Sequence, residues 1–270
     1  MNDSVSWLSK EIYSRYGDVK RARGCFLYTE KGVRLTDMYQ SDGRALLGWE
    51  GGKARLAFKN TLERSQTGFF TTHHFHALER AVLELFGDFS RVCVVKEECV
   101  RGKMPRWLPF LGLVDASDSS RCDFSKARAD FDGVDAFYFL PPFPFACDYV
   151  IVVSREDFAL ESELVPPVLL AAFTRSIYDL KGALQSRTED DFRFFDKSLE
   201  KYFLRRGPYL FVRKDMASSA EQYKKFVEFC LENGVVISPD INVPSVIPFG
   251  ADYGVLRKLV RADFGGEFSV

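Results

Sequence analysis

The stretch from Gly24 to Asp37, GCFLYTEKGVRLTD, decides the fold. Two runs of apolar and β-branched residues, FLYT and VRLT, stand close to either side of Lys31-Gly32. Aromatic and β-branched residues favour strands, and glycine accepts the positive φ that a tight turn requires. The pattern therefore predicts a β-hairpin with Gly32 at its turn.

Two further short strands are predicted near the other end of the chain. Residues 234–239 read GVVISP, and residues 245–250 read SVIPFG. Glycine and proline interrupt both runs, so each predicts a strand of only a few residues. Segments with helical spacing lie beside them in the sequence.

Apolar residues with helical periodicity predict most of the remaining elements. Leu8, Ile12 and Tyr16 recur at every fourth position, and Pro167 suits the first turn of a long helix. Predicted helices cover residues 5–16 and 53–64, a segment that ends at Gly87, a long segment from Pro167, residues 189–203, residues 219–232 and a segment from about Asp252. Predicted strands cover residues 91–95, 148–154, 209–212, 235–237 and 246–248, and residues 114–121 are predicted to form a loop.

Five positions carry a resemblance to a known family. Gly24, Tyr28, Gly32, Asp37 and Gly48 match, in order and spacing, the N-terminal pattern of class-III-type aminotransferases. These enzymes belong to the fold-type-I superfamily, which depends on pyridoxal phosphate (PLP). Later in the chain, the runs PPVLLAA and GVVISP resemble the small-domain helix and strand of the same family.

The resemblance covers roughly residues 5–65 and 160–262. It implies an α/β protein with an α+β small domain that an N-terminal hairpin and helices complete. Residues 1–65 and 156–270 would form this aminotransferase-like small domain. Residues 66–155 would be a reduced α/β remnant of the large PLP-binding domain.

PLP chemistry requires a Schiff-base lysine, a carboxylate opposite the pyridine nitrogen, and small residues at a helix N-terminus around the phosphate. The strand at 91–95 is followed by KEECV, whose acidic side chains would repel a phosphate. Asp135 and Asp148 are interpreted as loop residues, and Lys181 as a surface lysine in a helix. The run from 243 to 249 contains no arginine to clamp a substrate carboxylate. No catalytic or cofactor-binding residue can therefore be carried over.

These departures predict an aminotransferase-like protein without the PLP Schiff-base machinery, acting as a non-catalytic binding or interaction protein. No cofactor is predicted. The alternative is a divergent enzyme, PLP-dependent or amino-acid-binding, that uses a remnant cleft. That enzyme would bind a small amino-acid-like ligand in a candidate cleft formed by Tyr39, Gly48, Trp49, Asn242 and Ser245.

Phenylalanine is unusually frequent, with 26 residues in the chain. Five aromatic residues gather in one segment interrupted by prolines: Phe137, Tyr138, Phe139, Phe143 and Phe145. This segment is either an exposed interaction surface or a strap buried over the sheet. Because aromatic residues are common at interfaces and fold-type-I relatives usually pair, a homodimer is expected.

His73, His74 and His76 are the only histidines. Imidazole is a ligand for zinc and copper, so these residues are metal candidates. Neighbouring residues point in different directions, whereas metal sites usually take ligands from separate segments. Aromatic stacking or hydrogen bonding at a helix start is the alternative interpretation, and no metal site is predicted.

Composition narrows the remaining classes. A net charge of -1 argues against a nucleic-acid-binding protein, and no apolar run approaches the ~20 residues of a membrane helix. The N-terminus shows no secretory signal, so a cytoplasmic protein is expected. None of the six cysteines forms a Cys-x-x-Cys pair, which favours buried free thiols.

Overall fold

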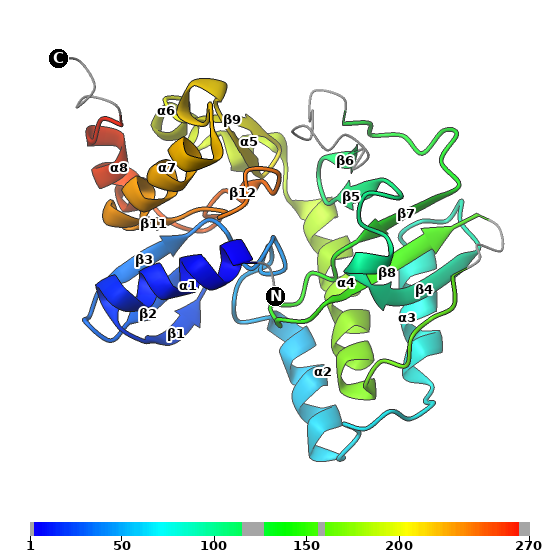
Figure 1. Ribbon diagram of the computed structural model, residues 1–270. Coiled ribbons are helices and arrows are strands. Elements are labelled where there is room, and N and C mark those ends of the chain that lie inside the picture. Colours follow the sequence, from blue (N-terminus) through cyan, green and yellow to red (C-terminus); the bar gives the residue numbers. More distant parts are fainter. Residues whose placement is uncertain (1–2, 115–126, 156–159, 265–270) are drawn as a thin grey trace. The chain divides into compact units, whose positions relative to one another are not determined.

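The computed structural model describes residues 3–114, 127–155 and 160–264, as a mixed α/β protein with two compact units (Figure 1). Unit 1 combines Met1–Glu50 with Thr188–Val270, and unit 2 is Gly51–Arg187. No helix within the described ranges is both long and apolar enough to cross a bilayer.

The helices and strands of unit 1 come from both ends of the chain. They are α1 (Asp3–Tyr16), β1 (Val19–Arg23), β2 (Phe26–Thr29), β3 (Arg34–Asp37), α5 (Glu189–Arg193), α6 (Asp196–Leu199), β9 (Phe203–Arg206), β10 (Tyr209–Val212), η3 (Lys214–Met216), α7 (Ala220–Glu232), β11 (Val235–Val236), β12 (Ser245–Val246), η4 (Tyr253–Leu256) and α8 (Arg257–Arg261).

Unit 2 is built from the central segment alone. Its elements are α2 (Gly52–Glu63), α3 (His74–Leu83), β4 (Arg91–Lys96), η1 (Glu97–Cys99), β5 (Arg106–Leu108), β6 (Gly112–Val114), β7 (Ala136–Phe139), β8 (Tyr149–Ser154) and α4 (Pro167–Ser186).

The predicted hairpin is confirmed, with β2 and β3 antiparallel. Gly32 has a φ of 76°, and its backbone N–H donates to the Thr29 carbonyl at 3.1 Å. The sheet of unit 1 has the order β1-β2-β3-β11. β11 lies parallel to β3, with Val235 opposite Thr36, so the two ends of the chain share one sheet (Figure 1).

A second, smaller sheet of unit 1 has the order β12-β10-β9. Its first strand is tied to the chain that leaves β3, because the Val246 N–H donates to the Met38 carbonyl at 2.6 Å. Ile247 donates to the carbonyl of Pro208 at 2.8 Å. The segment around β12 therefore links the two sheets of unit 1.

The helix predicted over 189–203 is divided into α5 and α6, and its last residue begins β9. Arg205 on β9 explains the break. Its Nη1 lies 2.8 Å from Glu189 Oε1, and its Nε and Nη2 contact the two carboxylate oxygens of Asp196 at 2.5 and 3.0 Å. This bidentate pairing folds the chain back on itself where a continuous helix would carry it away.

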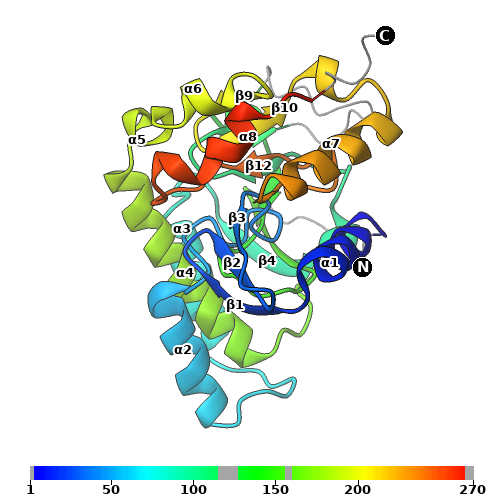
Figure 2. The same cartoon turned by 90° about the vertical axis from the view of Figure 1, so that its left-hand side faces the viewer.

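The five-stranded sheet of unit 2 has the order β4-β8-β7-β5-β6. Neighbouring strands are antiparallel except β5 and β7, which pair in parallel at Arg106 and Tyr138. α4 packs along both α2 and α3, and Figures 1 and 2 show it running beside α2. The loop predicted over 114–121 lies outside the described residues, apart from Val114 at the end of β6.

The unit boundaries differ from the domain boundaries predicted at 65/66 and 155/156. α2 and α4 pack on each other and therefore belong to one unit. The division into a small domain and a large-domain remnant stays a prediction.

Aromatic side chains fill one face of the unit 2 sheet. Phe86, which follows α3, meets Trp107 at 4.8 Å, Phe137 at 4.9 Å and Phe139 at 5.6 Å between ring centroids. The opposite face is also covered, by a cluster that includes Tyr138, Val150 and Val152. Both faces of β7 and β8 are thus buried, as the continuous apolar run of β8 predicts.

The aromatic segment is therefore not an exposed interaction surface, and this interpretation of the sequence was wrong. Phe137, Tyr138 and Phe139 are buried in β7. Phe143 is also buried, against Phe58 and Phe173, and Phe145 alone is exposed, at 39%. The physical reason is that the segment begins as a central strand, so its side chains pack on both faces of the sheet.

We predict that Phe137→Ala destabilises the protein by about 3–5 kcal/mol, because it removes a fully buried ring and leaves a cavity. Phe145→Ala, in the same segment, is the matched control and costs well under half as much because its ring is partly in solvent. Urea unfolding followed by circular dichroism measures both. Equal losses would contradict the packing described for β7.

Candidate functional site

A buried carboxylate ends strand β3. Asp37 is 2% exposed, and its Oδ1 accepts hydrogen bonds from the backbone N–H groups of Tyr39 at 3.0 Å and Gln40 at 2.9 Å. Its Oδ2 accepts one from the indole Nε1–H of Trp49 at 2.8 Å. All three donors are neutral, so the carboxylate is hydrogen-bonded without a charge partner among them.

Burial raises the pKa of Asp37 to about 6, because the charged form loses its hydration. The hydrogen bonds from Gln40, Trp49 and Tyr39 oppose this rise and lower the pKa only in part. No cation in the described ranges is among the groups that shift this pKa. Asp37 is thus a desolvated carboxylate that changes charge close to neutral pH.

The loop after β3 holds Trp49 in place. Gln40, Ser41 and Asp42 have φ values of 50°, 53° and 63°, in the left-handed region that non-glycine residues rarely adopt. The Trp49 N–H then donates to the Gly24 carbonyl at 2.9 Å, which returns the loop to the start of the hairpin. Strained backbone of this kind is held by its surroundings and often marks a functional site.

A cavity of about 330 Å³ lies in unit 1 between α1 and the strands of the sheet. Its lining includes Asp37, Tyr39, Ser41 and Trp49. Apolar and polar residues of α1 also line it, as do apolar residues from β1, β2 and β11. A cavity of this size is at the small end of the range for ligand pockets, about 300–1,000 Å³.

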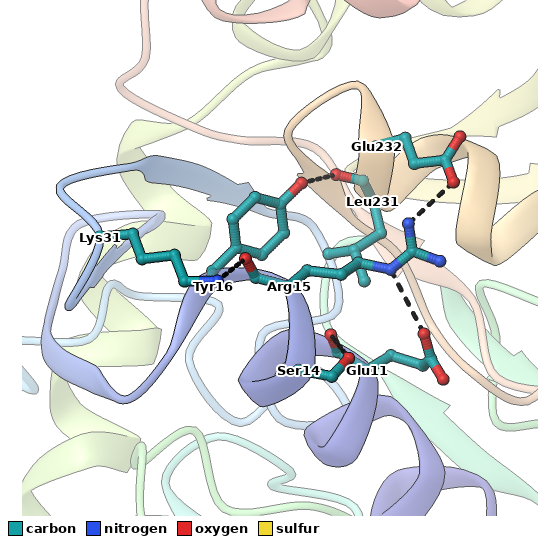
Figure 3. A network of polar contacts seen from close by, with 7 residues as sticks. All are labelled: Glu11, Ser14, Arg15, Tyr16, Lys31, Leu231 and Glu232. Carbon is teal, nitrogen blue, oxygen red and sulfur yellow. Dashed lines mark hydrogen bonds and ion pairs between the residues drawn. The ribbon is translucent and has the colours of Figure 1, made fainter.

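Helix α1, one wall of the cavity, is fixed at its C-terminal end by the contacts drawn in Figure 3. Arg15 pairs with Glu232 of α7 at 2.8 Å and with Glu11 at 3.3 Å. The Tyr16 hydroxyl donates to the Leu231 carbonyl at 2.8 Å, and Lys31 Nζ donates to the Arg15 carbonyl at 2.8 Å. These contacts tie α1 to α7 and to the hairpin turn.

The structure brings together only part of the cleft predicted from the sequence. Tyr39 and Trp49 line the cavity, and Gly48, with a φ of 100°, makes the turn before Trp49. Ser245 is buried in β12, where its hydroxyl accepts from the Ser238 N–H at 3.0 Å, and it does not line the cavity. Asn242 also lies outside the cavity lining, in a turn capped by Asp240.

Apart from Tyr39 and Trp49, sequence reasoning missed the residues that line this site, including both carboxylates, Asp37 and Asp18. Asp37 was matched only as a position of the scaffold. The sequence did contain one signal, a carboxylate at the end of a predicted strand. If such a carboxylate is buried, it needs hydrogen-bond donors around it.

The three histidines lie at the start of α3. The rings of His73 and His74 are 4.2 Å apart between centroids, and His74 Nε2 lies 3.2 Å from Gln66 Oε1. His76 Nδ1 lies 3.6 Å from Glu79. Burial, followed by the neighbouring His73 and Arg64, lowers the pKa of His74. Across residues 3–114, 127–155 and 160–264, no group of three or more His, Cys, Asp or Glu side chains is placed to hold a metal ion.

The lysines do not fit a PLP Schiff base. A Schiff-base lysine lies in a site where its amine is desolvated or otherwise activated. Every lysine in the described ranges is exposed except Lys181, which is partly buried and pairs with Glu84 at 3.4 Å. The described lysines therefore offer no group suited to the Schiff-base step of PLP chemistry.

The other PLP requirements are also unmet in the described ranges of unit 2. β4 is followed by η1, whose first residues are Glu97 and Glu98, and no α-helix begins directly after a strand there. Within the described part of unit 2, no α-helix N-terminus therefore stands directly at a strand end to face a phosphate. Asp135 and Asp148 are both exposed, immediately before β7 and β8.

Comparison with solved structures shows which known fold this architecture resembles. The chain is similar to ornithine aminotransferase from Plasmodium yoelii, with a TM-score of 0.57, 11% identity, and 95% of this chain and 97% of that one covered. It is also similar to serine palmitoyltransferase from S. paucimobilis, with a TM-score of 0.60 and 12% identity over 96% and 95% of the two chains. The fold is aminotransferase-like. At these identities the likeness concerns the fold alone.

Sequence relatives add no activity. An uncharacterized protein of Treponema pallidum is 34% identical over 148 residues, which span 52% of this chain and 45% of that protein, less than half its length. An uncharacterized protein of Borreliella burgdorferi is 23% identical over 254 residues, or 91% and 90% of the two chains. No family model matches the chain.

We predict that Asp37 makes stability depend on pH. The folded-state pKa of about 6 exceeds the ordinary value of 3.8, so between about pH 4 and 6 the folded state holds a proton that the unfolded state has released. Stability therefore falls as pH rises through this window. Asp37→Asn removes the effect, and its stability relative to the parent rises by about 1–3 kcal/mol from pH 4 to pH 7.5.

Urea unfolding at several pH values measures this difference. Asp18→Asn is the matched control, because Asp18 lines the same cavity but is exposed. Parallel pH profiles for Asp37→Asn and the parent protein would contradict the prediction.

Proposed function

We propose that this protein descends from class-III-type aminotransferases, has lost the PLP Schiff-base machinery, and acts as a non-catalytic binding or interaction protein. The observation that carries the proposal is the position of the lysines. All those described are exposed, apart from the partly buried and ion-paired Lys181. The cavity beside Asp37 in unit 1 is the proposed ligand site.

A cytoplasmic location is part of the same proposal. Cys25, Cys93 and Cys230 are buried thiols, and no disulfide joins any of the five cysteines in the described ranges. Burial raises the pKa of the Cys25 thiol to about 12, so it stays protonated and unreactive. Free thiols of this kind are typical of a reducing compartment.

One observation favours the alternative of a divergent enzyme with a remnant cleft. A buried carboxyl with a pKa of about 6 at the wall of a cavity is suited to general acid–base chemistry near neutral pH. In that case Asp37 would exchange a proton with a small amino-acid-like substrate. Turnover of amino acids that Asp37→Asn abolishes, in protein shown to be folded, would establish this alternative.

The proposal predicts that PLP does not form a specific adduct with this protein. Incubation with PLP, borohydride reduction and peptide mass spectrometry would find only low, scattered labelling, because every lysine in the described ranges is exposed apart from the partly buried, ion-paired Lys181. A known PLP enzyme treated alongside is the positive control. Stoichiometric labelling of a single lysine would overturn the proposal.

We further propose that the protein is a homodimer. Leu56 and Leu62 on α2, and Phe69 and Phe70 in the segment after it, are exposed at 58%, 47%, 66% and 54%. Large exposed apolar side chains on one helix and in the segment after it are suited to a protein interface. Light scattering at micromolar concentration is expected to give twice the chain mass of 30.8 kDa. Leu62→Glu with Phe69→Glu would give the single-chain mass, and a single-chain mass for the parent would contradict the dimer.

A further inference from the structure

We propose that the cavity beside Asp37 binds a small protonated amine with an apolar body, and that it rejects the corresponding amino acid. This inference rests on the proposed binding role and gives the chemical class of the ligand. It depends on three features of unit 1: the charges that line the cavity, the free acceptor capacity of Asp37, and the aromatic walls.

The charged residues that line the cavity favour a cationic ligand. Asp37 and Asp18 are the two carboxylates of the lining, which contains no lysine, arginine or histidine. An amino acid would bring its own carboxylate into this negative surrounding with no arginine or lysine to pair with it. An amine brings only the positive charge, so attraction is not offset by repulsion.

Asp37 has room for one more donor. An ionised carboxylate has about four acceptor positions, and three N–H groups from Tyr39, Gln40 and Trp49 occupy three of them. A buried carboxylate without a counter-ion is costly in free energy. An ammonium group at the remaining position forms a charge-assisted hydrogen bond and supplies the missing counter-charge.

The remaining walls suit an apolar body of limited size. Leu8 and Ile12 of α1 and Val236 of β11 line the cavity with aliphatic surface. Trp49 and Tyr39 line the cavity together with Asp37, and an ammonium group gains from contact with an aromatic face. A volume of about 330 Å³ suits a one-ring or short-chain amine better than a larger ligand.

The affinity for the amine should fall as the pH is lowered. The titratable residues that bond to the Asp37 backbone or line the cavity with it are Cys25, whose carbonyl accepts from the Asp37 N–H, and Tyr13, Asp18 and Tyr39. Neither the cysteine nor the two tyrosines carries a positive charge at any pH. Protonation of Asp37 below its pKa of about 6 therefore removes the partner of the ammonium group and weakens binding.

The test compares phenethylamine, phenethyl alcohol and phenylalanine by titration calorimetry on the full chain without PLP. The three share one ring and spacer and differ in charge. At pH 7.5 the amine is expected to bind about tenfold more tightly than either of the others, which corresponds to about 1.4 kcal/mol. At pH 5, where the amine is still charged, this preference is expected to disappear.

Two kinds of variant locate the site. Asp37→Asn is expected to remove the preference for the amine. Ser9→Trp, at an exposed position of α1 on the cavity lining, is expected to abolish amine binding without touching the buried carboxylate. Ser14→Trp is its matched control, because Ser14 is exposed on the same helix but does not line the cavity.

Each outcome decides the inference. Failure of the folded parent protein to bind phenethylamine, equal binding of the three compounds, or amine binding that Ser9→Trp leaves unchanged would overturn it. These results would leave the non-catalytic proposal standing, because that proposal depends on the PLP labelling experiment. Specific labelling of one lysine by PLP would instead overturn the non-catalytic proposal and would not by itself explain an amine preference at Asp37.

Discussion

The parallel pairing of β11 with β3 is the constraint on which unit 1 depends. The Thr36 N–H donates to the Gly234 carbonyl and the Met38 N–H donates to the Val236 carbonyl, both at 2.8 Å. These bonds join residues from opposite ends of the chain, so closing them costs loop entropy that local contacts alone do not repay. The compact folding of the central segment as unit 2 shortens the effective loop, and the buried side chains of β11 supply the compensating hydrophobic free energy.

The cavity follows from this pairing. Once β11 is placed, α7 lies where Glu232 and Leu231 bind the end of α1, and α1 is held beside the sheet. Asp37 then ends a strand that is covered by other elements, and its carboxylate loses contact with water. The strained loop after β3 returns Trp49 to that carboxylate. The buried carboxylate and the strained loop, which both destabilise the fold, thus lie around one cavity. Such a concentration is common at functional sites.

In unit 2, the sequence feature that suggests an interaction site is part of the hydrophobic core. Its aromatic residues pack on the sheet. The high aromatic content, which by itself suggests an interface, supplies much of the core of this unit. Four of the five aromatic residues in the segment from Phe137 to Phe145 are buried. The same sheet is largely antiparallel, and no α-helix begins directly after one of its described strands. Ligands of open α/β sheets bind at the carboxyl ends of parallel strands, and this sheet offers one such pair.

Local sequence determined the elements whose signals are local: the hairpin with Gly32 at its turn, the buried strand β8, and the helices with regular apolar spacing. The resemblance at five spaced positions also indicated the aminotransferase-like fold. Only tertiary structure decided that Arg205 would break a helix, that Phe137 would be buried, and that Asp37 would lie in a cavity. The reason is physical. Periodicity and turn propensity act over a few residues, whereas burial and charge pairing depend on which distant segments pack together, and those contacts leave little trace in a single sequence.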